Sequence, residues 1–198
     1  MLQEGLVQVY TGTGKGKTTS SLGLALRAVG HNLTVCMIQF MKSGDTGELF
    51  AVERYLPNIK IIQFGKDALD EKQMKIFSHK GEKKHDNTLQ EDEVYIFLPD
   101  SDEEEASRRG LEYAKRVVTT GEADIVILDE INCAIDKKLI NVDDVVDLIK
   151  KKPKHVELIL TGRGAPQKII DAADYVSEIR RIKHPYDKGI LARKGIEY

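Results

Sequence analysis

The residues best suited to chemistry lie in the stretch TGTGKGKTT, residues 11–19, which combines glycine, lysine and threonine. Its glycines permit a tight turn whose backbone N–H groups can all face one anion. They are Gly12, Gly14 and Gly16. Lys17 can reach terminal phosphates, and the Thr18 hydroxyl can ligate a magnesium ion. A second lysine, Lys15, makes the stretch more cationic than phosphate binding alone requires. We therefore predict a loop that binds a nucleoside triphosphate with Mg²⁺.

The spacing of this stretch departs from the common phosphate-loop pattern G-x-x-x-x-G-K-[ST]. Counting back from the Gly-Lys-Thr at residues 16–18, the first glycine position falls on Thr11, and Gly12 comes one residue late. The plain alternative is a glycine-rich turn followed by a helix N-cap. We favour triphosphate binding, because the stretch lies between a predicted strand and a predicted helix whose N-terminus adds partial positive charge.

Two further polar groups each follow an apolar run. DIVILDEIN ends its run in Asp129 and Glu130, and carboxylates at the carboxyl end of a parallel strand can hold Mg²⁺ directly or through water. Their alternative role is to cap the next helix, and both roles can coexist. LILTGRGAP places Arg163 between two glycines, where its guanidinium can contact phosphate or ribose. The alternative there is a simple turn with an exposed arginine.

Hydrophobic patterns define the elements that must position these residues. Strands are expected at residues 6–10, 33–40, 59–64, 124–129, 155–160 and 175–182, the last at a sheet edge. Helices are expected at residues 18–29, 47–56, 103–119, 142–150 and 166–173. The first helix should carry Leu22, Leu26 and Val29 on one apolar face. This order predicts an α/β fold, a mainly parallel sheet with helices on both faces, in a single domain spanning residues 1–198.

Composition limits the partners of this domain. The net charge of −2 and the pI of about 6.2 argue against a broadly basic surface for nucleic acid. We find no signal peptide and no run long enough to span a membrane. Cys36 and Cys133 are expected to be buried reduced thiols, which suits the cytoplasm. Residues 66–100 are dense in charge, and we expect a surface insertion there.

Four stretches taken together closely resemble the P-loop corrinoid adenosyltransferases: GTGKGKTTSSLGLALRAVGH, VILDEIN, LTGRGAP and AADYVSEIRRIKHPYDKGILARKGIEY. The resemblance covers nearly the whole chain and is weak only across residues 66–100. It implies a P-loop NTPase-like, RecA-like sheet, with ATP and a reduced corrinoid as substrates and Mg²⁺ as cofactor. It also implies that Co(I) attacks the 5′ carbon of ATP, in cobalamin biosynthesis or salvage, and that inorganic triphosphate leaves. The unusual spacing fits a loop that holds the triphosphate in reversed sense, as a leaving group.

The resemblance also assigns roles by position. The nucleotide-contacting positions are Gly12, Thr13, Gly14, Lys15, Gly16, Lys17, Thr18, Thr19, Arg27 and Arg163. The catalytic positions are Lys17, Thr18 and Glu130, and the magnesium ligands are Thr18 and Glu130 with Asp129 beside them. Arg27 alone could equally be a solvated helix residue. The family suggests a homodimer, and a flavoprotein-type reductase as partner.

One family feature is altered in this chain. The family places an aromatic-x-Trp pair near the corrin, and this chain has no tryptophan. Tyr95 and Phe97 stand nearest to that position, and either a corrin-facing role or ordinary packing would explain them. Two competing functions stay open. One is a RecA-like ATPase that couples hydrolysis to a nucleic-acid or protein partner, and the other is a nucleotide-binding relative without corrinoid chemistry.

Overall fold

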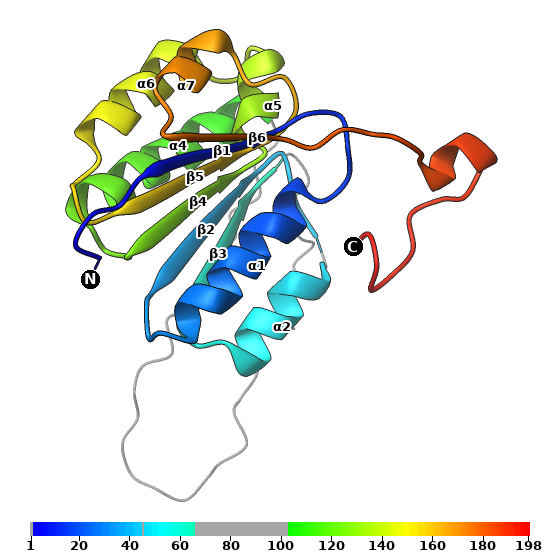
Figure 1. Ribbon diagram of the computed structural model, residues 1–198, viewed down its shortest axis with the longest axis horizontal. Coiled ribbons are helices and arrows are strands. Elements are labelled where there is room, and N and C mark those ends of the chain that lie inside the picture. The colour runs from blue at the N-terminus through cyan, green and yellow to red at the C-terminus, as the bar shows by residue number, and fades with distance from the viewer. Residues whose placement is uncertain (1, 45, 66–102) are drawn as a thin grey trace, which may run out of the picture.

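The computed structural model describes residues 2–44, 46–65 and 103–198, which contain one six-stranded sheet in the order β3-β2-β4-β5-β1-β6 (Figure 1). All of its strand pairs are parallel. The strands are β1 (Val7–Thr11), β2 (Val35–Phe40), β3 (Ile59–Phe64), β4 (Ile125–Asp129), β5 (Glu157–Thr161) and β6 (Tyr175–Glu178). The expected parallel sheet is confirmed.

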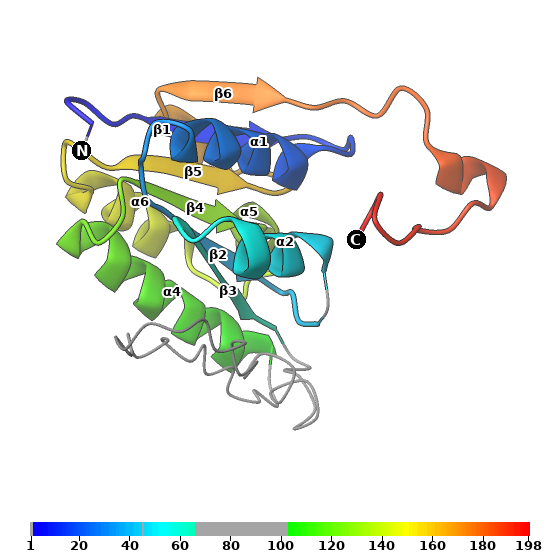
Figure 2. The ribbon, with the colours of Figure 1, turned by 90° about the horizontal axis from the view of Figure 1, so that it is seen from below.

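Helices cover both faces of this sheet, as predicted (Figure 2). They are α1 (Lys17–Val29), α2 (Gly47–Tyr55), α4 (Glu103–Thr120), α5 (Ile131–Asp136), α6 (Val142–Lys151), α7 (Gln167–Asp171) and the 3₁₀ helix η1 (Pro185–Lys188). α1 and α2 pack on one face through a cluster that includes Ala25 and Val52. The cluster on the other face takes residues from α4, α5, α6 and α7, among them Leu111 and Leu148. The molecule is therefore a three-layer α/β structure.

The central strands bring polar residues to one edge of the sheet. Every residue of β2 and of β4 is buried, as expected for strands covered on both faces. Gln39 of β2 lies in register with Asp129 of β4, and Tyr10 of β1 lies in register with Thr161 of β5. Because all these strands are parallel, their carboxyl ends meet at a single edge, and the glycine-rich loop that follows β1 begins there.

Two details of the sequence-based expectation are wrong. Leu26, expected on the apolar face of α1, is 58% exposed, and the apolar residues that this helix buries are Ala25 and Ala28. Small side chains allow the helix to approach the sheet closely, so the longest side chains do not mark its buried face. The last strand, expected over residues 175–182, ends at Glu178, and it does lie at the sheet edge.

Other parts of the expectation were incomplete. The helix α5 and the 3₁₀ helix η1 were not expected. The charged insertion predicted at residues 66–100 lies outside the described residues. Among the helices that the structure describes, each is too short or too polar to cross a membrane.

The buried thiol of Cys36 yields a prediction about stability. Burial in β2 raises the pKa of this thiol from its ordinary value of 9.0 to about 11. In the unfolded chain the thiol loses its proton first, so rising pH favours unfolding by up to ~1.4 kcal/mol per pH unit within that window. We expect the unfolding free energy, measured in urea, to fall more steeply between pH 9 and pH 11 for the wild type than for Cys36→Ala. Parallel pH profiles would contradict this account.

Candidate functional site

The glycine-rich loop connects β1 to α1, and Lys17 begins that helix. Gly16 precedes it with a φ of 118°, a conformation that favours glycine. The Lys17 ammonium donates hydrogen bonds to the carbonyls of Gly12 at 3.0 Å and Gly14 at 2.7 Å. Burial is the main cause that lowers the pKa of Lys17, the nearby charge of Arg163 lowers it further, and Glu130 opposes both. Lys17 therefore closes the loop with contacts that a phosphate can replace.

The three loop glycines do not share one role, which corrects the expectation that their N–H groups all face one anion. The Gly14 N–H donates to the carbonyl of Ile179, just after β6, at 2.7 Å. A Cβ added to Gly12 would lie 2.5 Å from that same carbonyl oxygen, and one added to Gly14 would lie 2.8 Å from it. A Cβ on Gly16 would meet no atom within 4 Å. Gly12 and Gly14 thus serve close packing against the chain after β6.

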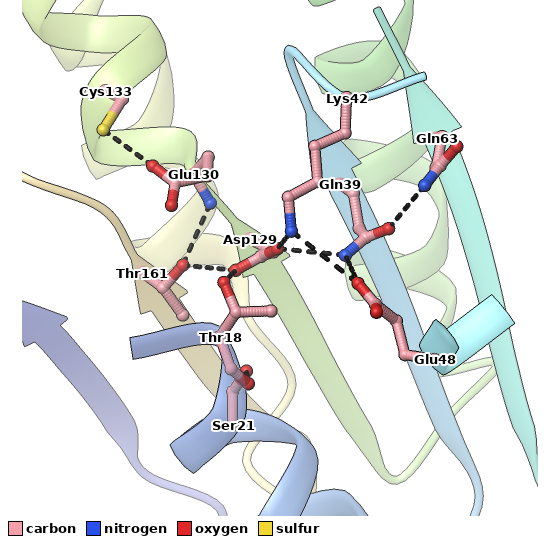
Figure 3. A network of polar contacts seen from close by, with 10 residues as sticks. All are labelled: Thr18, Ser21, Gln39, Lys42, Glu48, Gln63, Asp129, Glu130, Cys133 and Thr161. Atoms are coloured by element: carbon pink, nitrogen blue, oxygen red, sulfur yellow. Dashed lines mark hydrogen bonds and ion pairs between the residues drawn. The ribbon is translucent and has the colours of Figure 1, made fainter. Parts of the chain in front are cut away.

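Asp129 is the centre of the polar network at the sheet edge (Figure 3), and its exposed fraction is 0%. Its Oδ1 accepts hydrogen bonds from the hydroxyls of Thr18 at 2.8 Å and Thr161 at 2.7 Å. Its Oδ2 accepts from Gln39 Nε2 at 3.1 Å and from Lys42 Nζ at 2.9 Å. Both carboxylate oxygens therefore have two donors each.

This saturation affects the predicted magnesium site. Asp129 cannot ligate a metal ion directly without releasing one of its donors. The Thr18 hydroxyl donates its hydrogen to Asp129, so its lone pairs are available on the other side. Glu130 lines the adjacent pocket, and its carboxylate accepts from the Cys133 thiol. Thr18 and Glu130 offer the hard oxygen ligands that Mg²⁺ prefers, alongside waters and phosphate oxygens.

The local backbone explains how Glu130 reaches the pocket. Its φ of 62° is left-handed, and its N–H donates to the Thr161 hydroxyl at 2.9 Å. Although Glu130 occupies the N-cap position of α5, its side chain makes no capping hydrogen bond. The capping alternative therefore does not describe this carboxylate. The φ of Glu130 instead turns the chain sharply between β4 and α5.

A pocket of about 520 Å³ opens above these residues. Of the predicted nucleotide-contacting residues, those that line it are Thr13, Gly14, Lys15, Gly16, Lys17, Thr18, Thr19 and Arg163. Arg27 does not line the pocket, since it lies nine residues beyond Thr18, about 14 Å along α1. Its predicted contact rests on the resemblance alone. Tyr95 and Phe97 lie outside the described residues.

The pocket also contains residues that sequence reasoning missed. Lys42, two residues after β2, binds Asp129 and lies 3.8 Å from a carboxylate oxygen of Glu48. His184 and residues 195–198 also line the pocket. Lys42 follows a buried strand, as Arg163 does, and that position was a usable signal. The prediction that Cys133 is buried is wrong, because this residue is only partly buried. That partial burial still raises the pKa of the Cys133 thiol to about 11.

Comparison with known proteins decides the family. The sequence profile described as "ATP:corrinoid adenosyltransferase BtuR/CobO/CobP" matches residues 3–198. The chain belongs to this adenosyltransferase family. It is 30% identical over 197 residues to "Corrinoid adenosyltransferase" from Escherichia coli (strain K12), covering 99% of this chain and 87% of the relative. It is 31% identical to "Corrinoid adenosyltransferase" from Sinorhizobium sp, covering 99% of this chain and 81% of that one.

The adenosyltransferase fold is also similar to more distant structures. "The cytoplasmic domain of EssC" matches with a TM-score of 0.51 and 13% identity, covering 98% of this chain and 35% of that one. At this identity the likeness shows the fold alone.

The two carboxylates should respond differently to substitution. Asp129→Asn leaves Lys42 beside a neutral group, so we expect the unfolding free energy to fall by about 3 kcal/mol without any ligand. Glu130→Gln changes a pocket-lining carboxylate, so we expect stability to change by no more than ~0.5 kcal/mol. It should instead weaken binding of Mg·ATP at least about tenfold, ~1.4 kcal/mol. Urea unfolding and titration calorimetry measure both effects. Equal stability of Asp129→Asn and the wild type would contradict the network.

The packing of the loop against the chain after β6 is tested by alanine. A Cβ at Gly14 would meet the carbonyl oxygens of Ile179 and Arg180, both at 2.8 Å. Gly14→Ala should therefore lower the unfolding free energy by ~1–3 kcal/mol. Gly23, on α1 with open space around it, is the matched control, and Gly23→Ala should stabilise by ~0.5–1 kcal/mol. If Gly14→Ala is as stable as the wild type, the packing account is wrong.

Proposed function

We propose that the protein transfers the 5′-deoxyadenosyl group of ATP to the Co(I) of a reduced corrinoid and releases inorganic triphosphate. The observation that supports this most is the pocket itself, which is lined by Lys17 and Thr18 of the glycine-rich loop together with Glu130 and Arg163. Family membership supports the corrinoid as the acceptor. In this reaction the electron pair of Co(I) forms the Co–C5′ bond. The C5′–O5′ bond breaks, its electrons stay with the triphosphate, and cobalt becomes Co(III).

The protein's own groups stabilise the charge that develops on the leaving triphosphate. Lys17 exchanges its two carbonyl contacts for phosphate oxygens, and its burial strengthens that attraction. Arg163, which also lines the pocket, adds a further cation. Thr18 and Glu130 would hold Mg²⁺, which neutralises phosphate charge when bound. Asp129 keeps the Thr18 hydroxyl in position from behind.

The biological setting is part of the same proposal. We place the reaction in cobalamin biosynthesis or salvage, in the cytoplasm, with a flavoprotein-type reductase that supplies Co(I). The active form would be a homodimer of one domain spanning residues 1–198. These points rest on the resemblance to the family, and Tyr95 and Phe97 remain the proposed corrin-facing pair.

The proposal predicts an activity that depends on Lys17. Anaerobic incubation with ATP, Mg²⁺ and chemically reduced cobalamin should convert the Co(I) absorbance spectrum to that of the adenosylated form. Lys17→Ala should reduce kcat/KM about 10²–10³-fold, since it removes a donor to the developing charge. Lys168, an exposed lysine paired with Asp143, is the matched control, and Lys168→Ala should retain full activity. Full activity in Lys17→Ala would contradict the proposed role.

A further inference from the structure

Residues 193–198 fold into a compact turn, here called the hook. The Arg193 carbonyl accepts hydrogen bonds from the N–H groups of Ile196 at 3.2 Å and Glu197 at 2.9 Å. The Gly195 N–H donates to the Tyr198 carbonyl at 2.7 Å, and Gly195 has a left-handed φ of 76°. The Arg193 guanidinium pairs with the Glu197 carboxylate at 3.1 Å. The hook is therefore held in a defined shape by its own contacts.

The hook returns to the phosphate loop from a distance. After β6 the chain runs away from the sheet through η1 and then comes back toward the N-terminal ends of α1 and α2 (Figures 1 and 2). There Lys15 Nζ donates to the Ile196 carbonyl at 3.3 Å. A Cβ on Gly47, the first residue of α2, would lie 3.9 Å from the Tyr198 carbonyl oxygen. The hook thus docks between the loop and α2.

At this position the hook supplies apolar surface to a polar pocket. Ile196 is 58% exposed and Tyr198 is 49% exposed, and both line the pocket. Leu22, one turn after Thr18 on α1, and Ala51, one turn after Gly47 on α2, line it too. One part of the pocket therefore presents phosphate-binding groups, and an adjacent part presents aliphatic and aromatic groups. That division suits a ligand with a triphosphate at one end and a flat heterocycle at the other.

We propose that the hook binds the adenine base of ATP, with Tyr198 stacking on the ring and Ile196 packing beside it. This inference rests on the proposed function, and it identifies the hook as the part of the pocket that binds the base of ATP. Stacking of a base on an aromatic side chain tolerates any base and contributes substantially to nucleotide affinity. The Lys15–Ile196 contact links this wall to the loop that holds the phosphates. Adenine binding here also anchors the nucleoside on the opposite side of C5′ from the triphosphate.

The test compares Mg·ATP with Mg·tripolyphosphate, a probe that has the phosphates and lacks the base. By titration calorimetry, Tyr198→Ala should weaken ATP binding about tenfold and change tripolyphosphate binding less than about twofold. Tyr198→Phe keeps the ring and should restore ATP affinity. The matched control is Tyr186→Ala on η1, where an exposed tyrosine that does not line the pocket is removed.

A fluorescence experiment tests the contact between residue 198 and the base directly. Since the chain has no tryptophan, Tyr198→Trp introduces a single indole at the hook. ATP should quench its fluorescence, and tripolyphosphate should not. The inference is overturned if Tyr198→Ala binds ATP as the wild type does, if it loses affinity for both probes equally, or if both probes quench alike. If the wild type binds tripolyphosphate but not ATP, the proposed function fails instead.

Discussion

Four hydrogen-bond donors converge on the buried carboxylate of Asp129, and the site depends on that convergence. Removing a charge from water is costly unless polar partners compensate it. Here the partners come from three elements besides β4: Thr18 from α1, Thr161 from β5, and Gln39 with Lys42 from β2 and the residues after it. The same bonds that compensate the buried charge of Asp129 therefore hold the glycine-rich loop against the carboxyl ends of the central strands.

The loop's unusual spacing acquires a structural meaning. Gly12 and Gly14 allow close approach of the chain after β6, and the Gly14 N–H is already bonded to Ile179. The glycine with open space beside it is Gly16, at the start of α1. The loop is thus fixed on one side by β6 and its continuation, which leads on to the hook at the pocket. A loop built this way suits a triphosphate held firmly while the bond to C5′ breaks.

The sequence predicted the fold and the site correctly where a residue's chemistry and its position at the end of a strand both indicated the same role. The bounds of β3 were predicted correctly, and the residues expected at strand ends, Glu130 and Arg163, do line one pocket. The prediction failed for features that depend on tertiary packing, namely which residues of a helix are buried and which remote segments reach the pocket. The small residues of α1 are buried instead of Leu26, and the hook reaches the pocket from a remote part of the chain. The contact between Lys42 and Asp129 could not be predicted from the hydrophobic pattern of the sequence, because it depends on the order of the strands in the sheet.

The central claim is that the loop holds the whole triphosphate as one leaving group. A single turnover with ATP, Mg²⁺ and excess cob(I)alamin, followed by ³¹P NMR of the products, tests it most directly. The account predicts one tripolyphosphate for each adenosylated corrinoid formed, with its three phosphates still joined. Release of ADP and orthophosphate would contradict it.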